Sequence, residues 1–372
     1  MLIGVPKEVK NNEFRIGLTP TSVREVVAHG HDVIVETNAG VGIGRTDDDY
    51  AAQGARIIDS AEEIFARADM IVKVKEPQAG ERKMLRPGQI LFTYLHLAPD
   101  PEQTKDLVDS GAICIAYETV TDAKGRLPLL APMSQVAGRM SIQAGAHCLE
   151  RAQGGEGILI GGVPGIAPAK VVVIGGGVVG ENAIQMAVGM GADITVLDRN
   201  LDVLNHLSER FGPVLTTMYS TQAALETSVL EADLVIGAVL VKGAAAPKLV
   251  TRELVSGMKA GSVLVDVAID QGGCFETSKA TTHADPTYVI DDVVHYCVAN
   301  MPGGVPRTST HALNNATLPY TLMLADRGYK DALLSSEHFL NGLNVIDGKI
   351  TEEAVAHDLG YDYVPARDAL SA

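Results

Sequence analysis

The 372-residue sequence lacks any apolar run near the roughly 18 residues that a membrane-spanning helix needs. Its N-terminus also lacks the character of a signal peptide, because Lys7, Glu8 and Lys10 interrupt the segment that would have to be apolar. The first residues are instead typical of a β-strand. We therefore expect a cytoplasmic protein that does not use a membrane as a partner.

Two further shortages narrow the possible functions. The chain has 30 Lys and Arg against 46 Asp and Glu, and its formal net charge of −16 repels phosphate backbones, which excludes nucleic acid as a partner. It has only four cysteines and no Cys-x-x-Cys spacing, which argues against a disulfide framework or a cysteine metal site. Buried, reduced thiols agree with a reducing cytosol.

Apolar residues make up 46% of the chain, enough to bury two cores, and the length favours two domains. In the first third, apolar runs of strand length alternate with helical stretches, one of which is opened by Thr19 and Pro20. This alternation is typical of a parallel sheet covered by helices on both faces. The predicted strands are 2–5, 33–36, 70–74, 90–95 and 112–116, and two further helices are 60–67 and 101–110.

The segment around 120–131 interrupts this alternation with Gly125 and Pro128, and is the best candidate for a domain boundary. A long helical pattern follows from Ser134 to Ala152. A second α/β series has predicted strands at 171–174, 193–198, 234–237 and 262–266, and the chain becomes helical again over 308–326. We predict two doubly wound α/β units joined by long helices. Periodicity does not assign the acidic C-terminal tail to either unit.

The most informative motif lies at the start of the second series. Gly175, Gly177 and Gly180 form G-x-G-x-x-G directly after a β-branched strand, and a helical stretch over 178–190 follows. The first glycine permits a tight turn, the second lets a pyrophosphate approach the backbone, and the third permits close packing of helix against strand. A helix N-terminus also favours phosphate binding. This arrangement is typical of a Rossmann-like dinucleotide-binding domain, and a tight turn without a ligand is the simpler alternative.

Asp198 ends the second strand of this unit, about 20 residues beyond the motif, where a carboxylate accepts hydrogen bonds from ribose hydroxyls. Its charge would repel the 2′-phosphate of NADP, so NAD is the expected cofactor. Arg199 leaves NADP open, because an arginine at this point can accommodate that phosphate. A second glycine-rich stretch at 161–165 precedes the motif and is predicted to be a loop or hairpin.

Four polar residues lie at or just beyond predicted strand ends, where open α/β sheets place ligands: Arg15, Lys75, His96 and Asp270. Each has a purely structural alternative, such as a surface ion pair, an extended lysine, a satisfied imidazole or a turn residue. Together they suit an amino or keto acid. An arginine binds a carboxylate through two hydrogen bonds, and a histidine shuttles a proton near neutral pH.

Several stretches closely resemble the L-alanine dehydrogenase family, and the resemblance runs colinearly from residue 1 to about 325. They are GVPKEVKNNEFRIGLTP at 4–20, KVKEP at 73–77, FTYLHLA at 92–98, LPLLAPMSQVAGR at 127–139, the glycine motif, DLVIGAVLVKGAAAPKLV at 233–250, VDVAIDQGGCFE at 265–276 and VANMPGGVPRTST at 298–310. The resemblance is specific because motifs from both predicted units match.

This resemblance implies reversible, NAD-dependent deamination of L-alanine to pyruvate and ammonia. By the same resemblance, Arg15 and Lys75 bind the substrate carboxylate, His96 is the general acid/base and Asp270 is the second catalytic residue. Positions lining the substrate pocket are Tyr94, Met133 and Asn300. Besides the three glycines, the implied cofactor contacts are Ser134, Val178, Asp198, Ser220, Val239, Leu240, Val267, Ala268, Ile269, Asp270, Val298, Ala299, Asn300 and Met301.

The resemblance further implies a homohexamer and two domains with a cleft between them. The substrate domain comprises 1–128 and 306–372, and the NAD-binding domain 129–305. The sequence departs from the family pattern at several positions. Ile16-Gly17 follow the arginine where Val-Ala is usual. Val179 replaces the usual alanine of the glycine motif, and Val203 replaces a lysine found in some relatives. Met323 and Arg327 stand where some relatives hold magnesium. Neither is a ligand for a hard cation, so we expect no metal.

Three other functions fit parts of the pattern. The NAD-binding subunit of a proton-translocating transhydrogenase shares the two-domain layout but needs no amino-acid pocket. A saccharopine dehydrogenase would need a wider cleft for its larger substrate. A non-catalytic NAD-binding protein would need none of the four polar residues.

Overall fold

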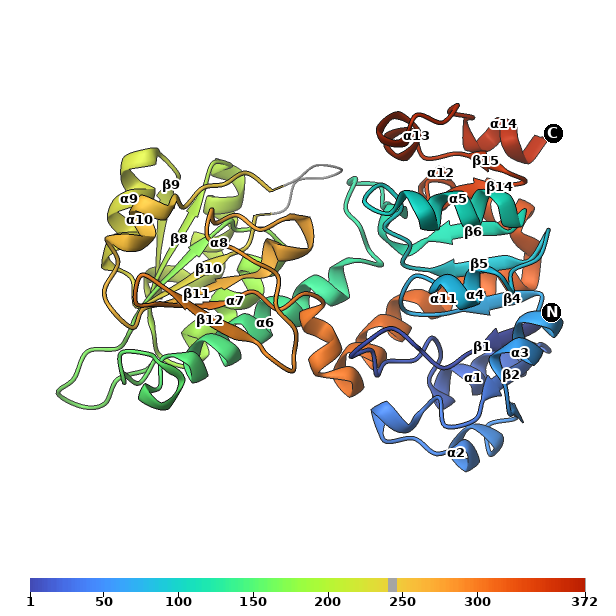
Figure 1. The fold of residues 1–372 in the computed structure, drawn as a ribbon, viewed down its shortest axis with the longest axis horizontal. Helices are drawn as coiled ribbons and strands as arrows, with labels where there is room; N and C mark the ends of the chain where they lie inside the picture. The colour runs from blue at the N-terminus through green and yellow to red at the C-terminus, as the bar shows by residue number, and fades with distance from the viewer. Residues whose placement is uncertain (240–245, 372) are drawn as a thin grey trace. The chain divides into compact units, whose positions relative to one another are not determined.

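The computed structural model describes residues 1–239 and 246–371. The chain divides into two compact units, one made of Met1–Met133 with Val305–Ala372 and the other of Ser134–Gly304 (Figure 1). The first unit therefore contains both ends of the chain. This assigns the acidic C-terminal tail, which periodicity could not place, to the N-terminal unit.

The first unit is built on an eight-stranded sheet in the order β15-β14-β6-β5-β4-β1-β2-β3. The six strands from β3 to β6 are parallel neighbours, and the direction of winding reverses between β1 and β4. The strands are β1 (Leu2–Val5), β2 (Asp32–Glu36), β3 (Arg56–Ile58), β4 (Met70–Val72), β5 (Ile90–Thr93), β6 (Ile113–Ala116), β14 (Leu343–Ile346) and β15 (Lys349–Ile350).

Local capping explains where several helices of this unit begin. Thr19 accepts a hydrogen bond from the backbone of Ser22, and Pro20 occupies the first turn of α1, as the sequence predicted. Asp100 and Pro101 open α5 in the same way. The helices are α1 (Pro20–Ala28), α2 (Asp47–Ala51), α3 (Ala61–Arg67), α4 (Ala79–Arg82), α5 (Pro101–Ser110), α11 (Pro306–Leu334, interrupted at Gly328), α12 (Glu337–Leu340), α13 (Glu353–Leu359) and α14 (Ala366–Ser371), with short 3₁₀ turns η1 (Val41–Ile43) and η2 (Tyr117–Thr119).

The second unit has a seven-stranded sheet in the order β12-β13-β11-β10-β7-β8-β9, which again reverses beside its first strand, between β7 and β10. The strands are β7 (Lys170–Ile174), β8 (Asp193–Asp198), β9 (Leu215–Tyr219), β10 (Leu234–Gly237), β11 (Val263–Asp266), β12 (Thr287–Ile290) and β13 (Val293–Tyr296). The helices are α6 (Ala131–Cys148), α7 (Val178–Gly189), α8 (Leu201–Phe211), α9 (Gln222–Glu231) and α10 (Arg252–Ser256), and the 3₁₀ turns are η3 (Arg151–Gln153), η4 (Gly212–Val214), η5 (Val267–Gln271) and η6 (Met301–Gly304).

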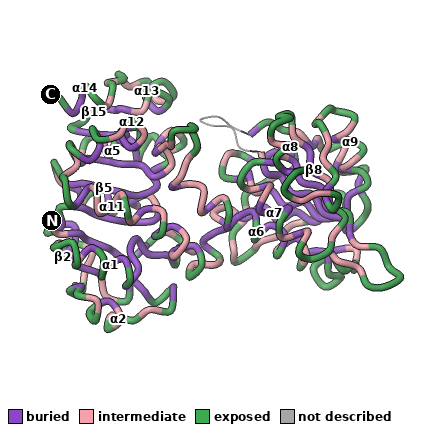
Figure 2. Tube along the Cα trace, turned by 180° about the vertical axis from the view of Figure 1, so that it is seen from behind, coloured by how far each residue is buried: buried purple, intermediate pink, exposed green. Residues whose placement is uncertain are grey.

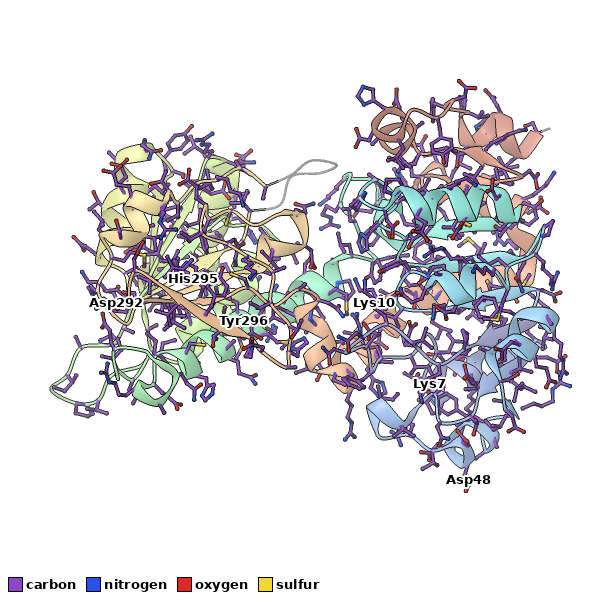
Figure 3. All side chains as sticks on the ribbon, viewed as in Figure 1. Lys7, Lys10, Asp48, Asp292, His295 and Tyr296 are labelled. Atoms are coloured by element: carbon purple, nitrogen blue, oxygen red, sulfur yellow. The ribbon has the colours of Figure 1, made fainter. Side chains whose placement is uncertain are left out.

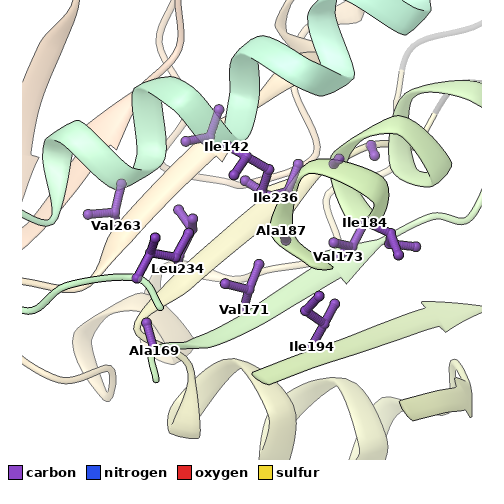
Figure 4. Close-up of a cluster of buried hydrophobic side chains, with 14 of the residues drawn as sticks. Ile142, Ala169, Val171, Val173, Ile184, Ala187, Ile194, Leu234, Ile236 and Val263 are labelled. Atoms are coloured by element: carbon purple, nitrogen blue, oxygen red, sulfur yellow. The ribbon is translucent and has the colours of Figure 1, made fainter. Parts of the chain in front are cut away.

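Alternation along the central strands produces the two faces of this sheet. Val171 and Val173 pack into a core with residues of α6, α7 and α8, whereas Val172 and Ile174 pack with α9 and α10 (Figure 4). Burial of each such side chain contributes about 1.5–3 kcal/mol relative to leaving it exposed. In both units the buried stretches follow the strands (Figure 2).

One buried polar group in this core is His295 on β13 (Figure 3). Its Nδ1 lies 2.9 Å from the Val293 carbonyl oxygen and its Nε2 lies 2.7 Å from the Thr277 hydroxyl. A neutral ring with a proton on Nδ1 satisfies both contacts. Burial lowers the pKa of His295, which keeps the ring neutral.

Each sheet carries antiparallel strands at one edge, which the predicted parallel sheets did not include. β12 joins β13 through Asp291 and Asp292, and β14 joins β15 through Asp347 and Gly348. All four loop residues have positive φ, the signature of the two-residue hairpin turn whose twist matches that of the flanking strands. The doubly wound, Rossmann-like prediction is confirmed, with these strands as additions. Over the described part of the chain, no helix has both the length and the apolar character to cross a membrane.

Candidate active site

The predicted site residues fall into two groups, one in each unit. In the first unit, the loops after β1, β4 and β5 leave the carboxyl ends of neighbouring parallel strands at the point where the winding reverses. Open α/β sheets bind ligands at such a point. The loop after β1 carries Lys7, Lys10 and Arg15, and Lys10 forms an ion pair with Glu76 of the loop after β4 (Figure 3). The two loops are thus tied together.

Arg15 is buried, with 2% of its surface exposed, and Glu13 holds it in place. The Glu13 carboxylate accepts hydrogen bonds from the Arg15 Nε, at 2.7 Å, and from Nη2, while Nη1 lies 3.0 Å from the Met133 sulfur. Burial alone would lower the pKa of Arg15, but Glu13 outweighs this effect and the pKa is raised. The guanidinium therefore stays charged and fixed in orientation, as recognition of a carboxylate requires.

Lys75 lies on the neighbouring loop, half-buried, and its carbonyl accepts a hydrogen bond of 3.0 Å from Thr93. Two residues earlier, Lys73 is fully buried, with its ammonium 2.7 Å from Glu81 and 3.1 Å from Glu8. Burial would lower the pKa of Lys73, but these two carboxylates raise it. Burial is also the main reason that the pKa of Glu8 is raised. Of the two lysines, Lys73 is thus committed to internal ion pairing, and Lys75 is the one placed for a ligand.

His96 follows β5 in an unusual backbone conformation, with φ of +50°. It is the only described non-glycine residue with positive φ that is neither Asn nor Asp. Glu118, in η2, maintains this turn by accepting hydrogen bonds from the backbone of Leu95 at 3.0 Å and of His96 at 2.6 Å. Backbone strain of this kind persists where the surroundings over-determine it and is concentrated at functional sites.

The His96 imidazole is 44% exposed, and its Nδ1 is 3.8 Å from the Glu118 carboxylate. Its ring stacks on Tyr94, with the centroids 5.8 Å apart. Tyr94 is buried and donates a hydrogen bond of 2.6 Å to the Leu129 carbonyl, and burial raises the pKa of its hydroxyl. The structure therefore places an accessible imidazole on a fixed aromatic support.

Glu13 and Glu118, which orient Arg15 and the backbone of His96, were not among the predicted site residues. Glu13 had a local signal, because a carboxylate two residues before an arginine can fold back on it. Glu118 lies 22 residues after His96 and had no local signal, since only the pairing of β5 with β6 brings the two loops together.

In the second unit, each glycine of the motif meets a different constraint. Gly175 has φ of +100°, and a Cβ added to it would lie 2.7 Å from the Ala238 carbonyl oxygen. A Cβ on Gly180 would lie 1.8 Å from the Gly175 carbonyl oxygen, so α7 packs against this turn without room for a side chain. A Cβ on Gly177 would meet no atom within 4 Å. Gly177 also caps α7 without a side-chain hydrogen bond, leaving N–H groups at the helix start available to an anion.

Asp198 ends β8 beside this turn. One carboxylate oxygen accepts a hydrogen bond from the Gly176 backbone at 2.7 Å and the other from Asn200 at 2.8 Å. The carboxylate therefore cannot swing away from the turn without losing both bonds. It borders a hollow lined by Asp198, Arg199, Asn200, Leu201, Asp202 and Tyr219. The open space at Gly177 and the fixed carboxylate fit the pyrophosphate and ribose of a dinucleotide.

Asp270 lies in η5, directly after β11, and its side chain is exposed. The Asn300 backbone donates a hydrogen bond of 3.3 Å to its carboxylate, so these two predicted residues are brought together. Asn300 itself has φ of +57°. Asp270 and Asn300 thus form one polar corner at the carboxyl ends of β11 and β13.

The remaining predicted cofactor residues lie on loops and helix starts of this unit. Val178 is 41% exposed at the first position of α7, and Ser134 is half-buried in α6. Val239 follows β10, and the Ser220 backbone donates a hydrogen bond to the Asp198 carbonyl oxygen. Leu240 lies outside the described residues. Ala268, Ile269, Val298 and Met301 are buried, and Val267 and Ala299 are half-buried.

Within residues 1–239 and 246–371, no group of three His, Cys, Asp or Glu side chains is arranged to hold a metal ion. The four cysteines, Cys114, Cys148, Cys274 and Cys297, are buried free thiols.

The strand order and the glycine turn define the second unit as a Rossmann-type dinucleotide-binding fold, and the six parallel strands of the first unit follow the same order. Comparisons with known proteins identify the family. The family model described as "Alanine dehydrogenase/PNT, N-terminal domain" matches residues 4–137, and the one described as "Alanine dehydrogenase/PNT, C-terminal domain" matches residues 141–353. The chain belongs to the alanine dehydrogenase/PNT family.

Its relatives match over nearly the whole length. An alanine dehydrogenase of Halomonas elongata is 62% identical, covering 98% of this chain and 99% of its own. One of Mycobacterium tuberculosis is 53% identical and covers both chains completely. Among solved structures, an L-alanine dehydrogenase has a TM-score of 0.94 at 52% identity, covering 97% of this chain and 99% of its own. A Sinorhizobium meliloti transhydrogenase has a TM-score of 0.80 at 24% identity, covering 95% of this chain and 100% of its own, which is a likeness of fold alone.

Proposed function

We propose that this protein is an NAD-dependent L-alanine dehydrogenase, an oxidoreductase that converts L-alanine reversibly to pyruvate and ammonia. The observation that carries the proposal is similarity at 52–62% identity to alanine dehydrogenases over both units together. The transhydrogenase alternative shares the family and the fold, but the transhydrogenase structure compared is only 24% identical. The charged site on the first unit favours an amino-acid substrate, which a transhydrogenase subunit would not need.

We assign substrate binding to the first unit, with 1–128 and 306–372 as the substrate domain. Arg15, oriented by Glu13, would bind the substrate carboxylate through two hydrogen bonds, and Lys75 would contact the carboxylate and the carbonyl oxygen. Tyr94, Met133 and Asn300 would line the pocket. The fixed guanidinium supports this assignment, since pre-orientation reduces the entropy lost on binding.

We assign acid–base chemistry to His96 and Asp270. NAD, when bound, accepts the hydride from the Cα of alanine. As the hydride leaves, the amino nitrogen gives up a proton to solvent and a C=N bond forms. His96 would then remove a proton from the water that attacks this imine, with Asp270 orienting that water. His96 would return the proton to the nitrogen as the C–N bond of the carbinolamine breaks, which releases ammonia and leaves pyruvate. The exposed imidazole, on its strained backbone and tyrosine support, suits a residue that must exchange protons while staying in place.

We assign NAD binding to the second unit, 129–305, through the glycine turn, Asp198, Ser134, Val178, Ser220, Val239, Leu240, the runs 267–270 and 298–301. The two backbone hydrogen bonds to the Asp198 carboxylate support NAD over NADP, because they hold a negative charge where the 2′-phosphate would lie. Arg199, adjacent in the sequence, is the residue that would favour NADP.

The test is reduction of NAD followed at 340 nm with L-alanine, L-serine, L-lysine or buffer alone. We expect turnover with L-alanine well above that with the other additions, and no NADP reduction at equal concentration. His96→Ala should lower turnover roughly 10²–10⁴-fold, the usual contribution of a general acid/base. Equal rates with L-alanine and buffer would refute the proposed activity, and a decrease below tenfold would remove His96 from its role.

We also propose a homohexamer in the cytoplasm. The hexamer is supported by the family resemblance, and the location by four thiols that remain free of disulfides. Light scattering on the purified protein should give a mass six times that of the chain, and cell fractionation should place the activity in the cytosol.

A further inference from the structure

The turn that carries Asp270 is held from within by Asp266. This buried carboxylate, at the end of β11, accepts hydrogen bonds from the backbone of Ala268 at 3.1 Å and of Cys274 at 2.9 Å, and from the Ser278 hydroxyl. These partners lie on both sides of Asp270 in the sequence. A single charged group, the Asp266 carboxylate, therefore connects the backbone before Asp270 with the backbone after it. Charge-assisted hydrogen bonds of this kind are about twice as strong as neutral ones.

Lys248 holds the same turn from outside. Its ammonium donates to three carbonyl oxygens, those of Gly272 at 2.6 Å, Gly273 at 2.9 Å and Phe275 at 3.2 Å. A lysine ammonium has three protons, so these three acceptors use its full donor capacity. Lys248 thus fixes the segment that directly follows Asp270.

Backbone contacts join the segment around Lys248 to the turn. Ala246 donates to the Gln271 carbonyl oxygen at 3.0 Å, and Leu249 to that of Cys274 at 2.8 Å. Val250 and Phe275 form a parallel bridge. The segment 246–250 is therefore fastened to the turn that presents Asp270.

We propose that Asp266 and Lys248 are positioning residues for Asp270: together they hold the 267–275 turn so that the Asp270 carboxylate is presented in one orientation. This inference rests on the proposed function, because it assumes that Asp270 acts in the reaction. The Asp270 side chain is exposed, and the Asn300 backbone donates a hydrogen bond of 3.3 Å to its carboxylate. The orientation of this carboxylate therefore depends on how the turn is held. A misplacement of about 1 Å can reduce a rate by about 10²-fold.

The experiment uses Lys248→Met, because the Lys248 residue is exposed and its replacement need not disturb the core, unlike a change of buried Asp266. Pyruvate reduction is measured for Lys248→Met, Asp270→Asn and the double variant, with Lys248→Arg as the conservative rescue. Lys170→Met is the matched control. Lys170 pairs with Glu231 on the surface, at the opposite end of the strands.

We expect Lys248→Met to lower kcat at least about tenfold in the parent and less than about threefold in the Asp270→Asn background, because coupled residues are non-additive. The NADH dissociation constant should stay within about threefold, Lys248→Arg should recover most of the rate, and Lys170→Met should match the parent.

Two kinetic results would overturn the inference: a fully active Lys248→Met enzyme, or losses that multiply independently in the double variant. If Asp270→Asn keeps parental activity, the role of Asp270 in the proposed function fails, which is a distinguishable outcome. Loss of the folded state in Lys248→Met, seen by circular dichroism, would show a structural role and would also overturn it.

Discussion

Gly177 and Gly180 lie in the same turn but should respond in opposite ways to a single methyl group. In Gly180→Ala, the new Cβ would lie 1.8 Å from the Gly175 carbonyl oxygen, so backbone must move by about 1 Å or more. Overpacking of this kind costs typically about 1–3 kcal/mol, which exceeds the gain of up to about 1 kcal/mol from a better helix former. We expect a lower melting temperature and weaker NADH binding.

In Gly177→Ala, the methyl group meets no protein atom within 4 Å, and the backbone at φ of −68° accepts alanine without strain. Stability should change by less than about 0.5 kcal/mol. The methyl group fills the space where the pyrophosphate would reach the helix N-terminus. Loss of one hydrogen bond to a charged group, about 1.5–3 kcal/mol, weakens binding tenfold to about a hundredfold.

Stability is measured by circular dichroism melting, and NADH affinity by titration followed through NADH fluorescence. The chain has no tryptophan whose emission would overlap this signal. An unchanged NADH affinity in Gly177→Ala would refute the reasoning that this open space is the phosphate site. Parental stability in Gly180→Ala would refute the packing argument.

Three further predictions concern single side chains. Glu13→Ala removes the charge that orients buried Arg15. Denaturant titration should show the free energy of unfolding lowered by about 3–5 kcal/mol, and KM for pyruvate should rise. An unchanged KM would contradict the orienting role of Glu13. Glu118→Ala removes the acceptor that holds the strained backbone of His96, so kcat should fall about tenfold or more while the NADH affinity is unchanged. A parental kcat would show that this strained conformation is not needed for function. His295 has a lowered pKa, so its contribution to stability is present above about 6.5 and is lost as the pH falls, by up to about 1.4 kcal/mol per pH unit. His295→Gln should lack this component below pH 6.5, and identical pH profiles of melting for the two proteins would exclude it.

The antiparallel edges show how much more the sequence could have predicted. Asp347-Gly348 between two apolar runs is a strong local signal for a two-residue hairpin, and the structure has one there. The corresponding Asp291-Asp292 turn has a weaker signal, because aspartate adopts positive φ less readily than glycine. Only β15, with two residues, is too short for periodicity to reveal it.

The site residues also divide into those with a local sequence signal and those without one. Gly175, Gly177, Gly180 and Asp198 were predictable because their chemistry depends on spacing within one strand–turn–helix–strand unit. Glu13 lies two residues before Arg15 and had a local signal, whereas Glu118, which supports the backbone of His96, had none. Hydrogen bonds from Lys248 to the Asp270 turn join residues 24 to 27 positions apart, and no local pattern specifies them.

The order of strands and helices, the dinucleotide turn and the polar residues at strand ends follow from the sequence alone, because periodicity, glycine spacing and capping act within a few residues. The tertiary structure decided which carboxylate supports the backbone of His96 and what fixes the turn of Asp270. These features depend on parallel strands bringing distant loops to one sheet edge, and such proximity is a property of the folded chain.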